Sequence, residues 1–402
     1  MKKTFALLMA LICVFSLVAC SKTPAPTPSE TPTSTDTQSP AEDNSTTEAP
    51  AQDEVELEPY TFALYAPLTG DNARYGQTYK STVEIYVEKR NAEGGINGHP
   101  VVVEYYDDKN DPKESLNIAN LIAGRDDILG VVGSQTSTAT MTAVPVFQEV
   151  GIPMITPQAG QVDVTLTGNY IFRMCTIASF EGNLIARRMI EDDCQNLAVI
   201  YSNDDYGVNI LETWSGVVEE MGGTVIAAET FVSGQTKDFT PLLSKIKAAG
   251  ADAIYIEPGY SDAAMIVTQM AQLDCNFKIY GNTMLYKTEF LDAAGGNAEG
   301  MLLGSYINPN NTEENFVFIK EAYETATGNL TDMYVLNSYD AIALLCDAVA
   351  AVGPDRTAMA DWIANVKDWQ GASGVINFDE NRNPTKDMFW YVIENNEFVL
   401  AD

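Results

Sequence analysis

Histidine and paired cysteines are scarce in this sequence. One of the 402 residues is a histidine, His99, and it stands in a Gly-His-Pro turn. The six cysteines form no CxxC pair, and Cys13 and Cys20 lie within the first twenty residues. We therefore expect no catalytic residue, no metal and no cofactor that depends on such groups. Two states stay open for the other four cysteines: a disulfide bridge between Cys194 and Cys275, or four free thiols.

Basic residues are also few. The chain has 23 Lys and Arg against 56 Asp and Glu, a net charge of −33. This balance argues against nucleic acid or an anionic membrane surface as a partner. An apolar content of 46% is normal for a globular protein, and the length suffices for two domains.

The N-terminus has the pattern of a secretory signal. Residues 1–19 combine two lysines with an apolar run and a small-residue end. The four residues at the end of this signal, Leu17-Val18-Ala19 with Cys20 directly after it, resemble a bacterial lipobox. That resemblance implies that Cys20 is acylated and anchors the protein on the extracellular face of the cell membrane, or in the periplasm if there are two membranes. Residues 20–57 are rich in Thr, Pro and acidic side chains, which predicts a disordered tether.

Strand and helix patterns alternate through the rest of the chain. Helical patterns lie between the strand patterns, and Gly94-Gly95 and Gly222-Gly223 end two of them. This alternation predicts βαβ units and an α/β fold with parallel sheets. The expected strands cover residues 60–66, 101–106, 129–132, 152–155, 197–202, 224–230, 253–257 and 277–280.

A hydroxyl-rich turn follows the third of these strands. Residues 133–138 read Gly-Ser-Gln-Thr-Ser-Thr and open a helix. Ser137 and Thr138 therefore lie at a helix start, where free N–H groups and the dipole favour an anion. Without a cationic side chain in the turn, a small carboxylate fits better than a polyphosphate. The alternative is that these hydroxyls only cap the helix.

Several motifs in order carry a family resemblance: PLTGDNARYG, NAEGGINGHPV, LGVVGSQTSTAT, GIPMITPQAG and SNDDYG. Together they resemble the branched-chain amino acid (leucine/isoleucine/valine) type of periplasmic-binding-protein-like solute receptor, the substrate-binding lipoprotein of ABC transporters. The resemblance implies a type I periplasmic-binding-protein fold, with two Rossmann-like lobes joined by three crossover strands. It places lobe 1 at residues 58–174 plus 305–386 and lobe 2 at residues 175–304 plus 387–402.

The same resemblance implies a set of ligand-binding residues. Glycine stands at position 160 where the family usually has threonine, and Thr283 stands where amino acid binders place an acid for the ammonium. Glu257 could replace that acid; alternatively, the ligand has no ammonium and Glu257 makes an internal contact. The expected ligand-binding residues are Tyr75, Ser137, Thr138, Ala159, Gly160, Tyr206, Glu257, Tyr260 and Thr283.

The function implied is capture of a small ligand, most simply an amino acid, and its delivery to an ABC transporter permease by a monomeric protein. A sensory receptor for a membrane signalling partner is an alternative that gene neighbourhood would distinguish. A receptor for an amide or a small organic acid also stays open. A surface enzyme that uses Asp107 and Asp108 is the least favoured, because adjacent residues point to opposite sides of an extended chain.

Overall fold

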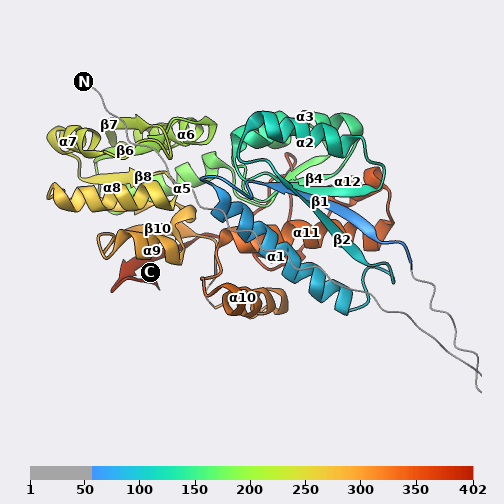
Figure 1. Ribbon diagram of the computed structural model, residues 1–402. Helices are drawn as coiled ribbons and strands as arrows, with labels where there is room; N and C mark the ends of the chain where they lie inside the picture. The colour runs from blue at the N-terminus through green and yellow to red at the C-terminus, as the bar shows by residue number, and fades with distance from the viewer. Residues whose placement is uncertain (1–56, 309, 402) are drawn as a thin grey trace, which may run out of the picture. The chain divides into compact units, whose positions relative to one another are not determined.

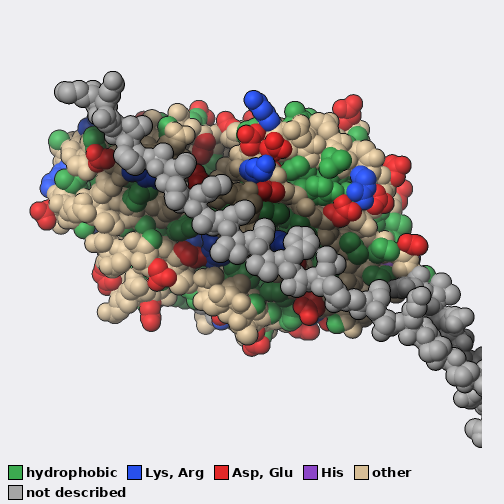
Figure 2. All heavy atoms as spheres, in the orientation of Figure 1, with side chains coloured by type: hydrophobic (Ala, Val, Ile, Leu, Met, Phe, Trp, Pro, Cys, Tyr) green, Lys and Arg blue, Asp and Glu red, His purple; other side chains and the backbone are tan. Residues whose placement is uncertain are grey.

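The computed structural model describes residues 57–401 apart from residue 309. The predicted signal segment, Cys20 and nearly all of the tether lie outside these residues. Acidic side chains are scattered over the face visible in Figure 2 rather than gathered in one patch, as expected for a solvated acidic surface.

The first lobe is built around a parallel five-stranded sheet with strand order β2-β1-β3-β4-β5. Its strands β1 and β3 are mostly apolar and, except for the first residue of β1, buried, as expected for a sheet covered on both faces. Its strands are β1 (Tyr60–Ala66), β2 (Val101–Asp107), β3 (Ile128–Gly133), β4 (Met154–Thr156) and β5 (Ile171–Arg173).

Helices cover both faces of this first sheet. In Figure 1, α2 and α3 lie on one face, and α1 and α11 lie on the other. The helices of this lobe are α1 (Ala73–Ala92), α2 (Pro112–Ala123), α3 (Ser137–Val150), α4 (Asp163–Leu166), α10 (Glu314–Thr327), α11 (Met333–Val352) and α12 (Arg356–Ala364). A small hairpin of β11 (Trp369–Gly371) and β12 (Gly374–Ile376) completes the lobe.

The second lobe contains a seven-stranded sheet with strand order β14-β13-β10-β9-β8-β6-β7. The strands from β7 to β10 run parallel, whereas β13 and β14 pair antiparallel. Its strands are β6 (Asn196–Ser202), β7 (Thr224–Phe231), β8 (Ala253–Ile256), β9 (Lys278–Gly281), β10 (Leu302–Ser305), β13 (Phe389–Glu394) and β14 (Glu397–Leu400). Its helices are α5 (Ala178–Glu191), α6 (Asp205–Glu220), α7 (Thr240–Ala249), α8 (Tyr260–Gln272) and α9 (Thr288–Ala294), with a 3-10 turn η1 (Thr283–Leu285).

The chain passes between the sheets after β5, after β10 and before β13. Helix α11, from late in the sequence, therefore packs against the early strand β3 and shares one hydrophobic core with β1 (Figure 1). Each lobe is therefore built from separated segments of the chain and not from one continuous half. The exact lobe boundaries given above stay predictions.

One local expectation needs correction. The fourth strand begins at Met154 rather than at residue 152, because Pro153 has no N–H to donate to the neighbouring strand.

Helix α11 is the one helix within residues 57–401 that is long and apolar enough to cross a membrane. Its most apolar stretch is 78% buried inside the protein. It is the core helix of the first lobe, in contact with α1, α12 and β3.

Candidate functional site

A cleft of about 420 Å³ opens where the carboxyl ends of the parallel strands of both lobes meet. Loops after β1, β2, β3 and β4 line it from the first lobe, and loops after β6, β7 and β8 line it from the second. In both sheets the strand order reverses at this edge, between β1 and β3 and between β6 and β8. Open α/β sheets bind ligands at such switch points.

The predicted hydroxyl-rich turn forms the first-lobe wall of the cleft. Thr136 caps α3, since its Oγ1 accepts a hydrogen bond from the N–H of Ala139 at 3.4 Å. Ser137 Oγ accepts the N–H of Gln161 at 3.1 Å, which leaves its own hydroxyl hydrogen to donate. Ser137 and Thr138 both line the cleft. The capping role therefore belongs to Thr136, and the two expected residues face the open space.

Thr138 also connects the lobes. Its Oγ1 donates a hydrogen bond of 2.8 Å to Asp205 Oδ2 at the start of α6. The Thr138 hydroxyl is thereby engaged, so the group that it can offer to a ligand is its backbone N–H, one of the first N–H groups of a helix.

Glu257 comes directly after β8 and lines the cleft from the second lobe. Only 1% of it is exposed, although it lines the cleft. Its Oε2 accepts hydrogen bonds from Ser202 N at 2.7 Å and from Ser202 Oγ at 3.0 Å. Burial raises the pKa of Glu257 to about 8, and the nearby Asp204 carboxylate adds to the shift. Without a ligand, this side chain is thus largely protonated at neutral pH.

Tyr206 presents its ring to the cleft and is held from behind by Glu181, a residue that the sequence analysis missed. Tyr206 Oη donates to Glu181 Oε2 at 2.7 Å, and the N–H of Thr283 donates to Glu181 Oε1 at 2.7 Å. Glu181 is 4% exposed, and burial raises its pKa. From sequence, Glu181 looks like an ordinary acid in the first turn of a helix.

Four of the expected residues do not line the cleft. The side chain of Arg173 draws the turn after β4 inward, where its Nη1 donates to the carbonyl oxygen of Ala159 at 2.9 Å. Ala159 and Gly160 are consequently buried, and Gln158 lines the cleft in their place. Thr283 is also buried, at 1% exposure, behind Tyr206 and Glu181.

Tyr260 is the fourth of these residues, and it packs beside the cleft residue Tyr75. Their ring centroids are 6.1 Å apart in an edge-on arrangement. Tyr75 lines the cleft, as expected, whereas Tyr260 supports it from behind. Among the expected residues, the structure thus brings together Tyr75, Ser137, Thr138, Tyr206 and Glu257.

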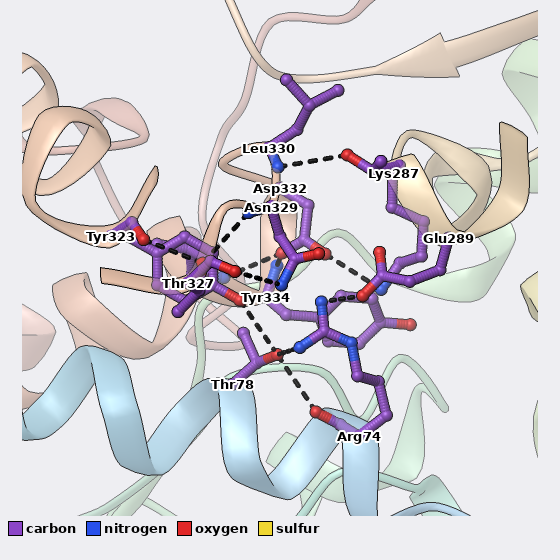
Figure 3. A network of polar contacts seen from close by, with 12 residues as sticks. Arg74, Thr78, Lys287, Glu289, Tyr323, Thr327, Asn329, Leu330, Asp332 and Tyr334 are labelled. Carbon is purple, nitrogen blue, oxygen red and sulfur yellow. Dashed lines mark hydrogen bonds and ion pairs between the residues drawn. The ribbon is translucent and has the colours of Figure 1, made fainter. Parts of the chain in front are cut away.

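A buried ion pair, drawn in Figure 3, joins the two lobes next to the rings of Tyr75 and Tyr260. Lys287 Nζ, from the residue before α9, is 2.9 Å from Asp332 Oδ2 at the start of α11. The ammonium also lies 4.5 Å from the ring centroid of Tyr334 and 5.1 Å from that of Tyr75. Close by, Arg74 pairs with Glu289, which again connects the lobes.

Other reactive side chains have structural surroundings. Cys175, Cys194, Cys275 and Cys346 are free thiols, so the bridge considered between two of them is absent from the described residues. Nowhere in residues 57–401 do three or more His, Cys, Asp or Glu side chains gather in a metal-binding group. The ring of His99 stacks on that of Tyr60, with 4.3 Å between the ring centroids, and His99 does not line the cleft.

The two carboxylates of the enzyme hypothesis are also accounted for. Asp107 Oδ1 accepts the N–H groups of Leu68 at 2.9 Å and of Lys109 at 3.0 Å. Asp108 is buried and accepts hydrogen bonds from Ser115 Oγ and Ser134 Oγ. Both side chains hold loops in place.

The two-lobed arrangement and the cleft agree with a family match over nearly all of the described chain. The periplasmic binding protein family model matches residues 59–397. The chain belongs to this family. The type I fold expected from the sequence motifs is thereby confirmed.

Named relatives in this family are moderately similar to the chain. A Leu/Ile/Val-binding protein homolog from Brucella melitensis is 28% identical, covering 82% of this chain and 90% of the relative. A leucine-, isoleucine-, valine-, threonine- and alanine-binding protein from Pseudomonas aeruginosa is 27% identical, and the match covers 79% of this chain and 85% of the relative. The solved structure of a branched-chain amino acid transporter substrate-binding protein from Streptococcus pneumoniae, in complex with isoleucine, is 25% identical with a TM-score of 0.78; the match covers 86% of this chain and all of that one.

Proposed function

We propose that this protein is a lipid-anchored solute receptor that captures an amino acid between its lobes and delivers it to an ABC transporter permease. The observation that carries this proposal is the polarity of the cleft. Hydroxyl and amide donors line the first-lobe wall, and a buried carboxyl group, Glu257, lines the second. The two ends of an amino acid, one anionic and one cationic, need these opposite partners.

The ligand carboxylate is assigned to the start of α3. Ser137 Oγ keeps a hydrogen to donate, and the first N–H groups of the helix lack intrahelical partners. A carboxylate is also favoured there by the helix dipole.

The ligand ammonium is assigned to Glu257 Oε1. Ser202 occupies the other oxygen, and within the described residues no hydrogen bond reaches Oε1. A buried ammonium without a carboxylate partner would cost several kcal/mol, and Thr283 supplies none. Glu257 thus takes the place of the acid that amino acid binders have at that position.

Ligand capture follows from contacts to both lobes. A ligand shifts a two-state protein toward closure only by the free energy of the contacts that are better in the closed state. Contacts to Ser137 on one lobe and to Glu257 on the other are of this kind, and no bond is made or broken in the process.

A thermal-unfolding screen tests the proposed function. The chain from Ser21 onward is heated in the presence of each amino acid, and of matched amides and organic acids. A ligand at 100 times its dissociation constant adds roughly 2.7 kcal/mol, which raises the unfolding midpoint by several degrees. Midpoint shifts confined to compounds that lack an ammonium group would reject the amino acid assignment.

Replacing Ser137 with alanine should weaken ligand binding. The variant loses one hydrogen bond to a charged group, worth roughly 1.5–3 kcal/mol. Titration calorimetry with the ligand found in the screen measures the loss. An unchanged dissociation constant would place the carboxylate elsewhere.

Replacing Cys20 with alanine should release the protein from the membrane. A diacylglyceryl chain pair on Cys20 supplies the anchor, and the globular part does not depend on it. Fractionation of cells followed by immunoblotting reports the location. Retention of the variant in the membrane fraction would disprove the anchor.

A further inference from the structure

Polar contacts join the two lobes on both sides of the cleft. On one side, three consecutive residues at the start of α9 each contact the first lobe (Figure 3). These α9 contacts are the ion pairs of Lys287 with Asp332 and of Glu289 with Arg74, and the hydrogen bond that Leu330 N donates to Thr288 Oγ1 at 3.2 Å. On the other side, Thr138 on α3 donates to Asp205 on α6. The cleft lies between the two sides, since Thr138 lines it at one and Tyr75, beside the Lys287 ammonium, lines it at the other.

The α9 contacts include a buried ion pair and are therefore difficult to break. The side chains of Lys287 and Asp332 are 2% and 3% exposed, and the centroids of three tyrosine rings lie 4.5–5.3 Å from the ammonium. Parting the lobes here would leave each lobe with a charge that has lost its partner in surroundings of low polarity, which is strongly unfavourable. The lobes are thus expected to stay together on this side of the cleft.

The Thr138–Asp205 bond is exposed and therefore easy to break. Asp205 is exposed, and Thr138 is half-buried. When the lobes part here, water can hydrogen-bond to both side chains, so only a small net stabilisation is lost. The Asp205 carboxylate also lies at the start of α6 and beside the first turn of α3, where both helix dipoles favour an anion. The bond therefore forms without a ligand whenever the two helix starts meet.

We infer that the Thr138–Asp205 bond is a clasp: the cleft opens between α3 and α6 while the α9 contacts persist, and the bond forms as the lobes close. Asp205 does not itself line the cleft, so it acts on a bound solute only through closure. A contact made only in the closed state stabilises that state and slows release, with little effect on the first encounter. The effect on release rests on the proposed function, whereas the way in which the lobes open does not.

Release kinetics test the clasp. The probe is the radiolabelled amino acid with the largest shift in the thermal screen, bound to the full-length protein in mild detergent and chased with unlabelled compound. Asp205→Ala should release the probe about three- to tenfold faster and bind it at an unchanged rate. Thr138→Val keeps the backbone N–H and should accelerate release similarly, and the double variant should be no faster than either single variant.

A matched control removes another exposed acid from the first residue of a helix. Glu314→Ala does so in α10 and should leave the release rate unchanged. Release from Asp205→Ala at the rate of the unaltered protein would overturn the clasp. Fully additive effects of the two substitutions would also overturn it, because two residues that act through one shared bond cannot each lose it separately.

Spin labels on the protein without ligand test how the lobes open. Double electron–electron resonance measures one distance on each side of the cleft, with and without Asp205→Ala. The exposed label sites are Glu149 on α3 with Glu212 on α6, and Glu88 on α1 with Asp292 on α9, each replaced by cysteine in a chain that carries Cys275→Ser. Asp205→Ala should shift the α3–α6 distances to longer values and leave the α1–α9 distances unchanged.

An unchanged α3–α6 distribution would overturn the clasp, and a lengthened α1–α9 distance would overturn the persistence of the α9 contacts. If no amino acid binds the unaltered protein, the proposed function fails, while these distances still decide how the lobes open.

Discussion

Replacing Asp332 with asparagine is expected to lower the free energy of unfolding by about 3–5 kcal/mol. Asp332 Oδ1 caps α11 by accepting the N–H groups of Tyr334 and Val335, and asparagine preserves this cap. The substitution therefore removes mainly the charge. It leaves the Lys287 ammonium unpaired at a side-chain exposure of 2%, among the rings of Tyr75, Tyr260 and Tyr334. Urea unfolding followed by circular dichroism measures the change.

Two control variants make this prediction specific. Adding Lys287→Met to the asparagine variant removes the stranded charge and should recover much of the lost stability. Glu289→Gln breaks the neighbouring pair with Arg74, whose side chains are 27% and 21% exposed, and should cost at most about 1 kcal/mol. If Asp332→Asn and Glu289→Gln lowered the free energy of unfolding equally, burial would not explain the effect of losing Asp332.

Replacing Glu257 with glutamine is expected to weaken amino acid binding by about 2–5 kcal/mol, roughly 30-fold to several thousandfold. The variant keeps the shape of the side chain but removes the only charge assigned to the ligand ammonium. Titration calorimetry measures the loss, with Glu212→Gln on the exposed face of α6 as the matched control. Equal affinities in the unaltered protein and the Glu257 variant would remove Glu257 from the site.

The pH dependence of the same variant provides an independent readout. The pKa of Glu257 is about 8 in the folded protein against an ordinary value of 4.5, with Asp204 and Glu181 adding to the effect of burial. The pKa of Glu257 is higher in the folded than in the unfolded protein, so the unfolded chain loses this proton first as the pH rises. The contribution of the neutral Glu257 carboxyl to stability is therefore complete below about pH 4.5 and is lost as the pH rises through 8. Glu257→Gln should therefore flatten the decline of the unfolding midpoint between about pH 5 and pH 8. An unchanged slope would show that another group dominates this range.

Ligand binding should release a proton for the same reason. An ammonium next to Glu257 favours the ionised carboxylate and lowers its pKa. Below about pH 8, the affinity should consequently increase with pH, and calorimetry in buffers of different ionisation enthalpy should detect the released proton.

Local features of the fold could be predicted from the sequence because their causes are local. The first strand was expected at residues 60–66 and is found there, since a continuous apolar run is typical of a strand covered on both sides. The hydroxyl-rich turn was recognised because capping residues precede a helix whose first N–H groups need partners. The return of α11 to the first sheet has no local cause, and only the family resemblance indicated it.

The rest of the site depends on contacts between distant residues. Glu181 meets the N–H of Thr283 across 102 positions of sequence, so nothing near either residue reveals the contact. Lys287 and Asp332 look like ordinary surface charges until the packing of Tyr75, Tyr260 and Tyr334 buries them. Ala159 was expected to bind the ligand, but its carbonyl oxygen accepts a hydrogen bond from Arg173, and the sequence does not reveal this contact.

The central claim is that both charged ends of an amino acid are held in the cleft between the lobes. Titration calorimetry with three compounds tests it most directly: the amino acid with the largest thermal shift, its analogue without the amino group, and its methyl ester. The proposed contacts of Ser137 and Glu257 predict that each analogue loses at least about 2 kcal/mol of binding free energy, roughly 30-fold in affinity. If the analogue without the amino group binds as tightly as the amino acid, the ligand is not recognised as a zwitterion and the account is wrong.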